Sequence, residues 1–299
     1  MREIPGRAIF ARIVRYLSIK IHTVLKELVM IEKIRNLYAP VQPTVKKSGN
    51  QVSYQEFLPQ AELLPFIYCY WELKTIAKLD NPFTYRVVTD GCIDIFFELH
   101  HPDNSYVMGF CKKYTEFPLE SPFHYIGVRF LPTTFSQIFN IDASFLSNRF
   151  QPLSQVSPAT SRFIGDYFDR DITSQQIPFI FDQYFLDAVD EKNFVLDSRL
   201  YNAIDVILKK CGVVNLATEI NTGISERQLR RLFKYYIGDT PKSFSKVVQF
   251  QNILKTKPSS QSLRRSKLFY DFGYYDQAHF IKDFKNFYGV TPSRAFGRE

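Results

Sequence analysis

Arg227, Arg230 and Arg231 place three guanidinium groups within five residues of one another. A guanidinium can donate two parallel hydrogen bonds, which suits either a phosphate or the major-groove edge of a guanine. Leu229 and Phe233 lie four residues apart and predict the buried face of a short helix, which leaves the three arginines facing outward. The arginines are therefore candidates for base recognition, and holding phosphates is the alternative for each of them.

A second segment, offset by 51 residues, carries a different set of polar groups. Gln277, His279 and Lys282 face outward when Phe280 and Phe284 are assigned to the buried face of a helix. Amide, imidazole and ammonium groups suit adenine edges and mixed contacts to bases. For His279 a partly structural role, as a ring packed beside the aromatic face, stays open.

Both segments belong to one repeated unit. Ser225 and Asp276 are suitable helix N-caps, Gly238 and Gly289 suit helix ends, and a Thr-Pro pair follows each glycine. A short apolar segment and a turn that contains a glycine precede each capped helix. A helix, a turn and a second helix describe a helix-turn-helix unit, whose second helix enters the major groove of DNA.

A helix from Pro241 to about Lys255 is predicted to join the two units. It would let the two recognition helices enter successive major grooves roughly 34 Å apart, so that one protomer covers two adjacent half-sites. Further basic residues lie near helix ends or near the start of the second unit, where a phosphate can be held without base geometry. These residues are Lys234, Lys285, Arg264 and Arg265, and simple solubility is the alternative for each.

The charge of the chain is distributed in three blocks. Residues 198–299 hold 18 Lys or Arg and 8 Asp or Glu, whereas residues 51–197 hold 10 and 19, and residues 1–50 hold 10 and 3. The overall charge of +8 therefore hides an acidic block between two basic ones. The C-terminal basic block coincides with the repeated units, as neutralisation of DNA phosphates requires.

The sequence from 273 to 280 (GYYDQAHF), with Phe284-Lys285 and the GVTP run at 289–292, resembles the C-terminal signature of the AraC/XylS family of transcriptional regulators. The resemblance extends over residues 199–297 and implies a DNA-binding domain with base and backbone contacts at the outward positions of both capped helices. It also favours an activator over a repressor, and it implies RNA polymerase as a partner.

Three positions depart from the family pattern. The turn of the first unit, at residues 221–223, is two residues longer, Phe269 stands where the family has alanine, and Gln249 stands where the connecting helix has arginine. The longer turn could tilt one recognition helix, and the other two departures imply repacking.

Residues 51–132 predict a small β-rich module, because short apolar runs alternate with turn signals. Val87-Val88 and residues 93–97 flank Asp90-Gly91 as a hairpin would, and residues 125–130 predict another strand. Segments 63–66 with Tyr70-Trp71, 89–95 and 127–132 resemble the cupin-like N-terminal domain of a subgroup of AraC-type regulators. This resemblance implies a small barrel used for sensing or dimerisation, with helices after it.

We therefore expect an α+β chain: an N-terminal cupin-like β-barrel followed by helices, then an all-α C-terminal domain with two helix-turn-helix units joined by a connecting helix. Helices are predicted at residues 134–149 and 158–189. The expected domains are a basic amphipathic helical extension and linker at 1–50, a cupin-like sensory or dimerisation domain with trailing helices at 51–190, and the AraC-type DNA-binding domain at 191–299.

Residues 8–38 place apolar side chains at helical spacing among basic ones. The frequent charges exclude a transmembrane span. Such a helix could lie on a membrane, bind a partner or dock on its own protein. Residues 39–50, with two prolines and a glycine, are predicted to be a linker.

The sequence offers little for catalysis. His100, His101 and His124 are the only histidines of the β-rich module, and two neighbours in a strand point to opposite faces, which makes a shared metal awkward. The four cysteines lack C-x-x-C spacing. Aromatic residues such as Trp71 could line an effector pocket, although filling a core is the commoner role. We expect no catalytic residue, bound metal or cofactor.

These observations predict a cytoplasmic, sequence-specific DNA-binding transcriptional regulator that binds double-stranded promoter DNA. They leave open a homodimer and a small-molecule effector of unknown identity. Three alternatives remain: a nonspecific architectural DNA-binding protein, a cupin-type metalloenzyme with a DNA-targeting domain, and a membrane-surface adaptor that uses residues 8–38.

Overall fold

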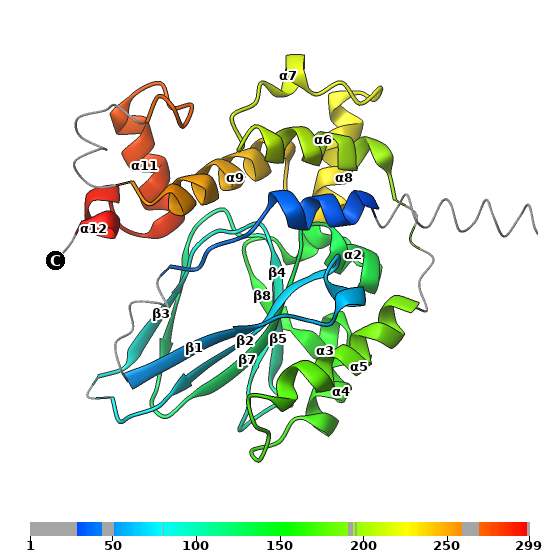
Figure 1. Ribbon diagram of the computed structural model, residues 1–299, viewed down its shortest axis with the longest axis vertical. Helices are drawn as coiled ribbons and strands as arrows, with labels where there is room; N and C mark the ends of the chain where they lie inside the picture. The colour runs from blue at the N-terminus through cyan, green and yellow to red at the C-terminus, as the bar shows by residue number, and fades with distance from the viewer. Residues whose placement is uncertain are drawn as a thin grey trace, which may run out of the picture.

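The computed structural model describes residues 29–43, 51–79, 81–190, 194, 196–258 and 269–297. A sheet-rich N-terminal domain is followed by helices and then by a helical C-terminal domain, and the C-terminal helices lie along one end of the sheets (Figure 1). The predicted α+β architecture is confirmed. Arg264 and Arg265, and most of the predicted N-terminal helix, lie outside the described residues.

Two sheets build the N-terminal domain. The larger has six strands in the order β1-β2-β7-β4-β5-β8, with antiparallel neighbours, and the smaller pairs β3 with β6. Aromatic residues from both sheets pack together in the space between them, so the sheets form the two walls of the predicted barrel. The strands are β1 (Val52–Phe57), β2 (Ile67–Thr75), β3 (Phe83–Val87), β4 (Ile93–Glu98), β5 (Ser105–Met108), β6 (Thr115–Leu119), β7 (His124–Phe130) and β8 (Phe150–Pro152).

The two faces of the six-stranded sheet have different neighbours. In β4, Ile93, Ile95 and Phe97 join the main core under the helices, whereas Asp94 and Phe96 face the space between the sheets. This alternation follows from the two-residue period of a strand. Asp94 is therefore a charged side chain on an inward face.

The predicted hairpin around Asp90-Gly91 is wrong. β3 pairs with β6, whereas β4 pairs with β5 and β7, so this turn connects the two sheets. Gly91 has φ +71, which a residue without a Cβ adopts at little cost. Residues 88–90 are held instead by polar side chains from distant parts of the chain.

The helices after the strands cover the outer face of the six-stranded sheet. Phe181 of the longest of them stacks on Tyr70 of β2, with ring centroids 5.0 Å apart. The predicted helix at 134–149 is shorter than expected, because Asn140 adopts a left-handed conformation with φ +54. The elements are η3 (Ala61–Leu63), α2 (Thr134–Phe139), η4 (Ala143–Leu146), α3 (Leu153–Val156), α4 (Pro158–Tyr167) and α5 (Gln176–Asp190).

The C-terminal domain holds the expected helices. The predicted connecting helix is confirmed as α9, and the capped helices of the two units are α8 and α11. The described elements are α6 (Ser198–Lys209), α7 (Leu216–Glu219), α8 (Glu226–Ile237), α9 (Pro241–Thr256), α11 (Gln277–Tyr288) and α12 (Pro292–Phe296).

Residues 29–43 are packed against both domains. Residues 29–37 are helical and lie beside α6 (Figure 1). Ile31, Ile34 and Tyr38 are buried in the main core, and the guanidinium of Arg35 donates to three backbone carbonyl oxygens of residues 64–68. Of the three alternatives for residues 8–38, the described part of this segment therefore docks on its own protein.

The described part of the predicted linker, residues 39–43, is also anchored. Gln42 is 2% exposed and bonds to both the N–H and the carbonyl oxygen of Val88. A buried amide with these partners cannot belong to a freely moving linker. None of the described helices is long and apolar enough to cross a membrane.

Candidate nucleic-acid interface

The sequence of α8 defines both of its ends. The Ser225 hydroxyl accepts from the N–H of Gln228, and the Gln228 side chain accepts from the N–H of Ser225, which completes a capping box. Gly238 ends the helix in a left-handed conformation with φ +105. The predicted limits of this recognition helix are confirmed.

The faces of α8 separate as the spacing predicts. Leu229, Phe233 and Ile237 are buried. The candidate arginines and Lys234 are exposed, and Arg230 forms an ion pair of 3.0 Å with Glu226 one turn earlier. Both partners of this pair are mostly in solvent, so it contributes little stability and leaves the guanidinium available.

The second recognition helix, α11, begins in the same way. The Asp276 carboxylate accepts from the N–H of His279 at 2.7 Å, and Gly289 ends the helix with φ +96. Phe280, Phe284 and Phe287 are buried. The outward candidates Gln277, His279, Lys282 and Lys285 are exposed.

His279 has a structural contact as well as an exposed edge. Its Nε2 lies 3.3 Å from Oδ2 of Asp283, and its ring packs edge-on against Tyr274 with centroids 5.3 Å apart. The same carboxylate also pairs with Lys246 of α9 at 2.8 Å. Asp283 therefore joins the second recognition helix to the connecting helix, a role that sequence reasoning missed.

The connecting helix contacts both recognition helices. Phe244 of α9 packs against Phe233 of α8, with ring centroids 6.0 Å apart, and Phe250 packs against Phe284 of α11 at 5.5 Å. Gln249, one of the departures from the family pattern, is buried and donates to the carbonyl oxygen of Phe272 in the turn of the second unit. The glutamine at this position is thus accommodated by a hydrogen bond between its buried side-chain amide and that turn.

A single loop of the N-terminal domain contacts both units. The Lys112 ammonium pairs with the Asp239 carboxylate at 2.7 Å, directly after α8. The carbonyl oxygen of Lys112 accepts from Nδ2 of Asn286 in α11, and the N–H of Tyr114 donates to the Asn286 carbonyl oxygen. We call residues 109–114 the bridging loop.

A groove runs beside the C-terminal half of α8. Arg231 and Lys234 form one wall, with Tyr235 and Tyr236 beside them. Asp142 and Ser144, at the start of η4, and Arg199 also line it. Sequence reasoning did not single out Arg199, which is exposed and bonded to Asp197.

The histidines of the N-terminal domain do not converge on a metal site. His124 bonds to Glu72 at 2.7 Å and His100 to Glu98 at 2.6 Å, so each ring has its own carboxylate partner. Within the described ranges no group of three or more His, Cys, Asp or Glu is arranged to hold a metal ion.

Residues 220–298 match a protein-family model described as a helix-turn-helix domain. This part of the chain is an AraC-type helix-turn-helix domain. The matched region contains both α8 and α11, and it makes the chain a DNA-binding transcription regulator. Residues 55–152, which include the strands of both sheets from β2 to β8, match a model described as a domain of unknown function (DUF6597).

Solved structures of ToxT from Vibrio cholerae resemble most of the chain weakly. A crystal structure of ToxT from strain O395 is 10% identical with a TM-score of 0.38, over 82% of this chain and 97% of ToxT. Wild-type ToxT of strain SCE256 bound to an unsaturated fatty acid is 11% identical with a TM-score of 0.38, over 83% and 95%. No curated protein matches the chain. We therefore base DNA binding on the domain match and the geometry of the AraC-type domain.

Proposed function

We propose that this chain is a sequence-specific transcriptional regulator in which α8 and α11 read two adjacent major-groove half-sites. The proposal is supported by one observation above all. Two capped helices each bury an apolar stripe and expose the opposite face, and both are packed on α9. A shared support of this kind fixes the spacing of two readers on one duplex.

The two readers carry different chemistry. Arg227, Arg230 and Arg231 give α8 three guanidinium groups, which suit a half-site that contains guanine. Gln277, His279 and Lys282 of α11 suit a half-site of mixed or adenine-containing sequence. We assign phosphate contacts to Lys234, Lys285, Arg264 and Arg265, since these need only charge and reach.

The N-terminal domain supplies the regulation in this proposal. A small molecule in the space between the sheets alters the contacts of that domain with α8, α9 and α11, and so the placement of the readers. The regulator acts as an activator in the cytoplasm, with promoter DNA and RNA polymerase as partners, and the trailing helices join two protomers. It performs no catalysis.

DNA selection from a random duplex library tests this function with the full chain. Wild-type protein is compared with Arg230→Ala and Lys282→Ala, and Arg162→Ala on exposed α4 serves as the control for loss of a basic side chain. We expect a bipartite motif with half-sites spaced by one helical turn. Each reader variant should relax one half only and cost ~1–3 kcal/mol of binding free energy.

The result that contradicts the proposal is equally concrete. Salt-sensitive binding without an enriched motif, unchanged by either reader substitution, would identify a nonspecific architectural protein. A motif with a single half-site would retain sequence-specific regulation and remove the second reader.

A further inference from the structure

The space between the two sheets contains a cavity that the DNA-binding domain does not explain. Aromatic and aliphatic side chains line most of it, and the cavity has a volume of about 80 Å³. Trp71 and Phe96 come from the six-stranded sheet, and Tyr85 and Phe117 come from the two-stranded sheet. An apolar cavity with a few polar groups is the usual form of a small-molecule site.

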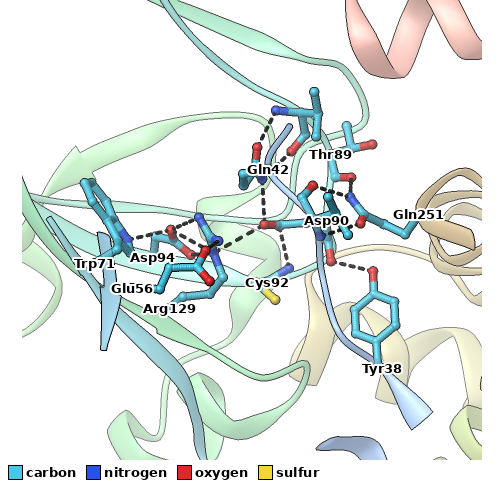
Figure 2. A network of polar contacts seen from close by, with 12 residues as sticks. Tyr38, Gln42, Glu56, Trp71, Thr89, Asp90, Cys92, Asp94, Arg129 and Gln251 are labelled. Atoms are coloured by element: carbon cyan, nitrogen blue, oxygen red, sulfur yellow. Dashed lines mark hydrogen bonds and ion pairs between the residues drawn. The ribbon is translucent and has the colours of Figure 1, made fainter. Parts of the chain in front are cut away.

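The charges at this cavity are carboxylates. Among the described residues that line it, Asp90 and Asp94 are the only charged ones. The nearest cation, Arg129, is 1% exposed, and its guanidinium is bonded to Asp94 at 2.9 Å and lies 3.4 Å from Asp90 (Figure 2). Glu56 lies 3.9 Å from the same guanidinium, so one cation faces three carboxylates and the net charge at this end of the cavity is negative.

This arrangement selects against anions. A carboxylate or phosphate ligand would approach two ionised carboxylates in an apolar space, where unscreened repulsion is strong. Arg129 does not line the cavity, its Nε and Nη2 donate to Asp94, and its Nη1 lies 3.9 Å from a third carboxylate, that of Glu56. Burial raises the pKa of Asp94 to about 6, against the opposing effect of Arg129, so the Asp94 carboxylate is still ionised at pH 7.5.

A neutral polar group in the cavity is also unpaired. Thr89 is one of the lining residues, and its buried hydroxyl has no hydrogen-bond partner within the described part of the chain. A buried hydroxyl without a partner is energetically costly, and a ligand donor would satisfy it. Thr89 precedes Asp90, so the unpaired hydroxyl and a carboxylate come from the same short segment.

The aromatic rings that line the cavity also favour a cation over an anion. The indole of Trp71 lies across Gly127, where any Cβ would collide with the ring, and its Nε1 donates to Asp94 at 3.1 Å. Tyr85 packs beside it, with ring centroids 6.5 Å apart. Aromatic faces attract cations and stack on flat apolar groups.

We propose that this cavity binds a small molecule that combines an aromatic or aliphatic body with a protonated amine. The amine lies against the carboxylates of Asp90 and Asp94 and the hydroxyl of Thr89. The body fills the space between Trp71 and the rings of the two-stranded sheet.

The same segment connects the cavity to the DNA-binding domain. The Thr89 carbonyl oxygen accepts from Nε2 of Gln251 in α9 at 2.7 Å, and the Asp90 carbonyl oxygen accepts from the Tyr38 hydroxyl at 2.6 Å (Figure 2). The Asp90 carboxylate accepts from Gln42 at 2.8 Å. An effect of the amine on DNA binding rests on the proposed function, whereas the binding of the amine does not.

Trp71 provides a direct probe, because it is the only tryptophan in the chain and it lines the cavity. The full-length protein at pH 7.5 is titrated with 2-phenylethylamine, 2-phenylethanol and 3-phenylpropanoate while tryptophan emission is recorded. We expect the amine to change the emission and to bind about tenfold or more tightly than the carboxylate, with the alcohol between them.

Three variants locate the amine. Asp94→Asn and Asp90→Asn should each weaken amine binding about tenfold, and Thr89→Val, which leaves Arg129 and its partners intact, should weaken it a few-fold. Asp166→Asn on the exposed surface of α4 is the matched control and should bind as the wild type does. Thermal unfolding of each variant identifies any that fails to fold, and Thr89→Val then carries the test.

Several results would overturn the inference. They are binding of the carboxylate as tight as that of the amine, no change of Trp71 emission with any of the three probes, or amine binding unaffected by the folded variants. Any of these, together with a bipartite DNA motif, would reject the amine site and leave the DNA-binding function standing.

Discussion

The two recognition helices share one design but are supported differently. α8 packs against η4 and α2 of the N-terminal domain as well as against α6 and α9. The helices that α11 packs against are α9 and α12, and its C-terminal end meets the N-terminal domain at the bridging loop and at Arg86 of β3. The first reader is thus built into the domain interface, whereas the second is held mainly by its own domain.

The hydrogen bonds follow the same division. The hydroxyls of Ser136 and Ser147 donate to the carbonyl oxygens of Tyr235 and Gly238, at the C-terminal end of α8. These bonds satisfy carbonyl groups that a helix end leaves without partners. A change in the N-terminal domain should therefore reach α8 first, and α11 through α9 and the bridging loop.

The largest loss of stability is expected when a buried aromatic ring is removed from each recognition helix. Phe284→Ala and Phe233→Ala each delete a fully buried aromatic side chain and should each cost ~3–5 kcal/mol. We expect Phe284→Ala to open the second unit locally and Phe233→Ala to weaken both domains together. Hydrogen exchange resolved along the chain distinguishes the two outcomes.

Tyr275→Ala is the control for loss of an aromatic ring, because its side chain is 86% exposed. It should change stability by less than ~0.5 kcal/mol. Equal loss of protection across both domains in the Phe233 and Phe284 variants would contradict the proposed division.

The glycines that end the two readers give a smaller effect. Gly238→Ala and Gly289→Ala each force a left-handed conformation on a residue with a Cβ, at ~1–2 kcal/mol. At Gly238 the new Cβ would also lie 3.0 Å from Cβ of Phe110, whereas at Gly289 its nearest atom is in the longer side chain of Arg86. We expect the larger loss of stability at Gly238.

Gly223→Ala isolates the cost of the backbone conformation. Gly223 has φ +71, and no atom lies within 4 Å of its added Cβ. Urea unfolding of the three variants should rank Gly238→Ala as the most damaging. A ranking in which Gly289→Ala costs more would show that α11, not α8, is the reader fixed by the N-terminal domain.

Each recognition helix carries one lysine that we propose to contact phosphate, so the same substitution can be compared on both helices. Lys234→Ala and Lys285→Ala should each reduce the slope of log K against log salt by about 0.9, with no change in the selected motif. Arg162→Ala should leave the slope unchanged. A normal slope for Lys234→Ala alone would assign this lysine to the groove that it shares with Asp142 rather than to DNA.

The helices of the DNA-binding domain could be predicted because their signals are local. Ser225 and Asp276 each cap a helix by accepting from the N–H three residues later, and Gly238 and Gly289 end the same two helices. Such signals depend on neighbouring residues and need no knowledge of the fold. The helical spacing of the apolar residues also predicted which candidate DNA-binding residues face outward. Their contacts with DNA stay predictions.

The features that sequence reasoning missed depend on distant partners. Gln251 bonds to Val41, 210 residues away, and the failed hairpin at Asp90-Gly91 reflects strands that pair elsewhere. One signal in the sequence points to the charges at the cavity, because Asp94 and Arg129 are opposite charges flanked by apolar residues in two strands. A charge on an inward face needs a partner, and here each is the partner of the other.

The bridging loop gives the smallest expected effect and the most direct test of how the two readers are linked. Lys112→Ala removes the ion pair with Asp239, whose carboxylate keeps the hydrogen bond from the N–H of Thr240 at 2.7 Å. The lysine is 52% exposed, so the loss of stability should stay below ~1 kcal/mol. Lys113→Ala, at the exposed neighbouring position, is the control.

The substitution should act on the first reader more than on the second. The contact of Lys112 with α11 uses its backbone carbonyl oxygen, which alanine retains, whereas its contact with Asp239 uses the side chain. Exchange of amide hydrogens should therefore increase at the C-terminal end of α8 and stay unchanged in α11. An equal increase in both helices would mean that the loop holds them as one unit, and that the two readers are coupled through the N-terminal domain as well as through α9.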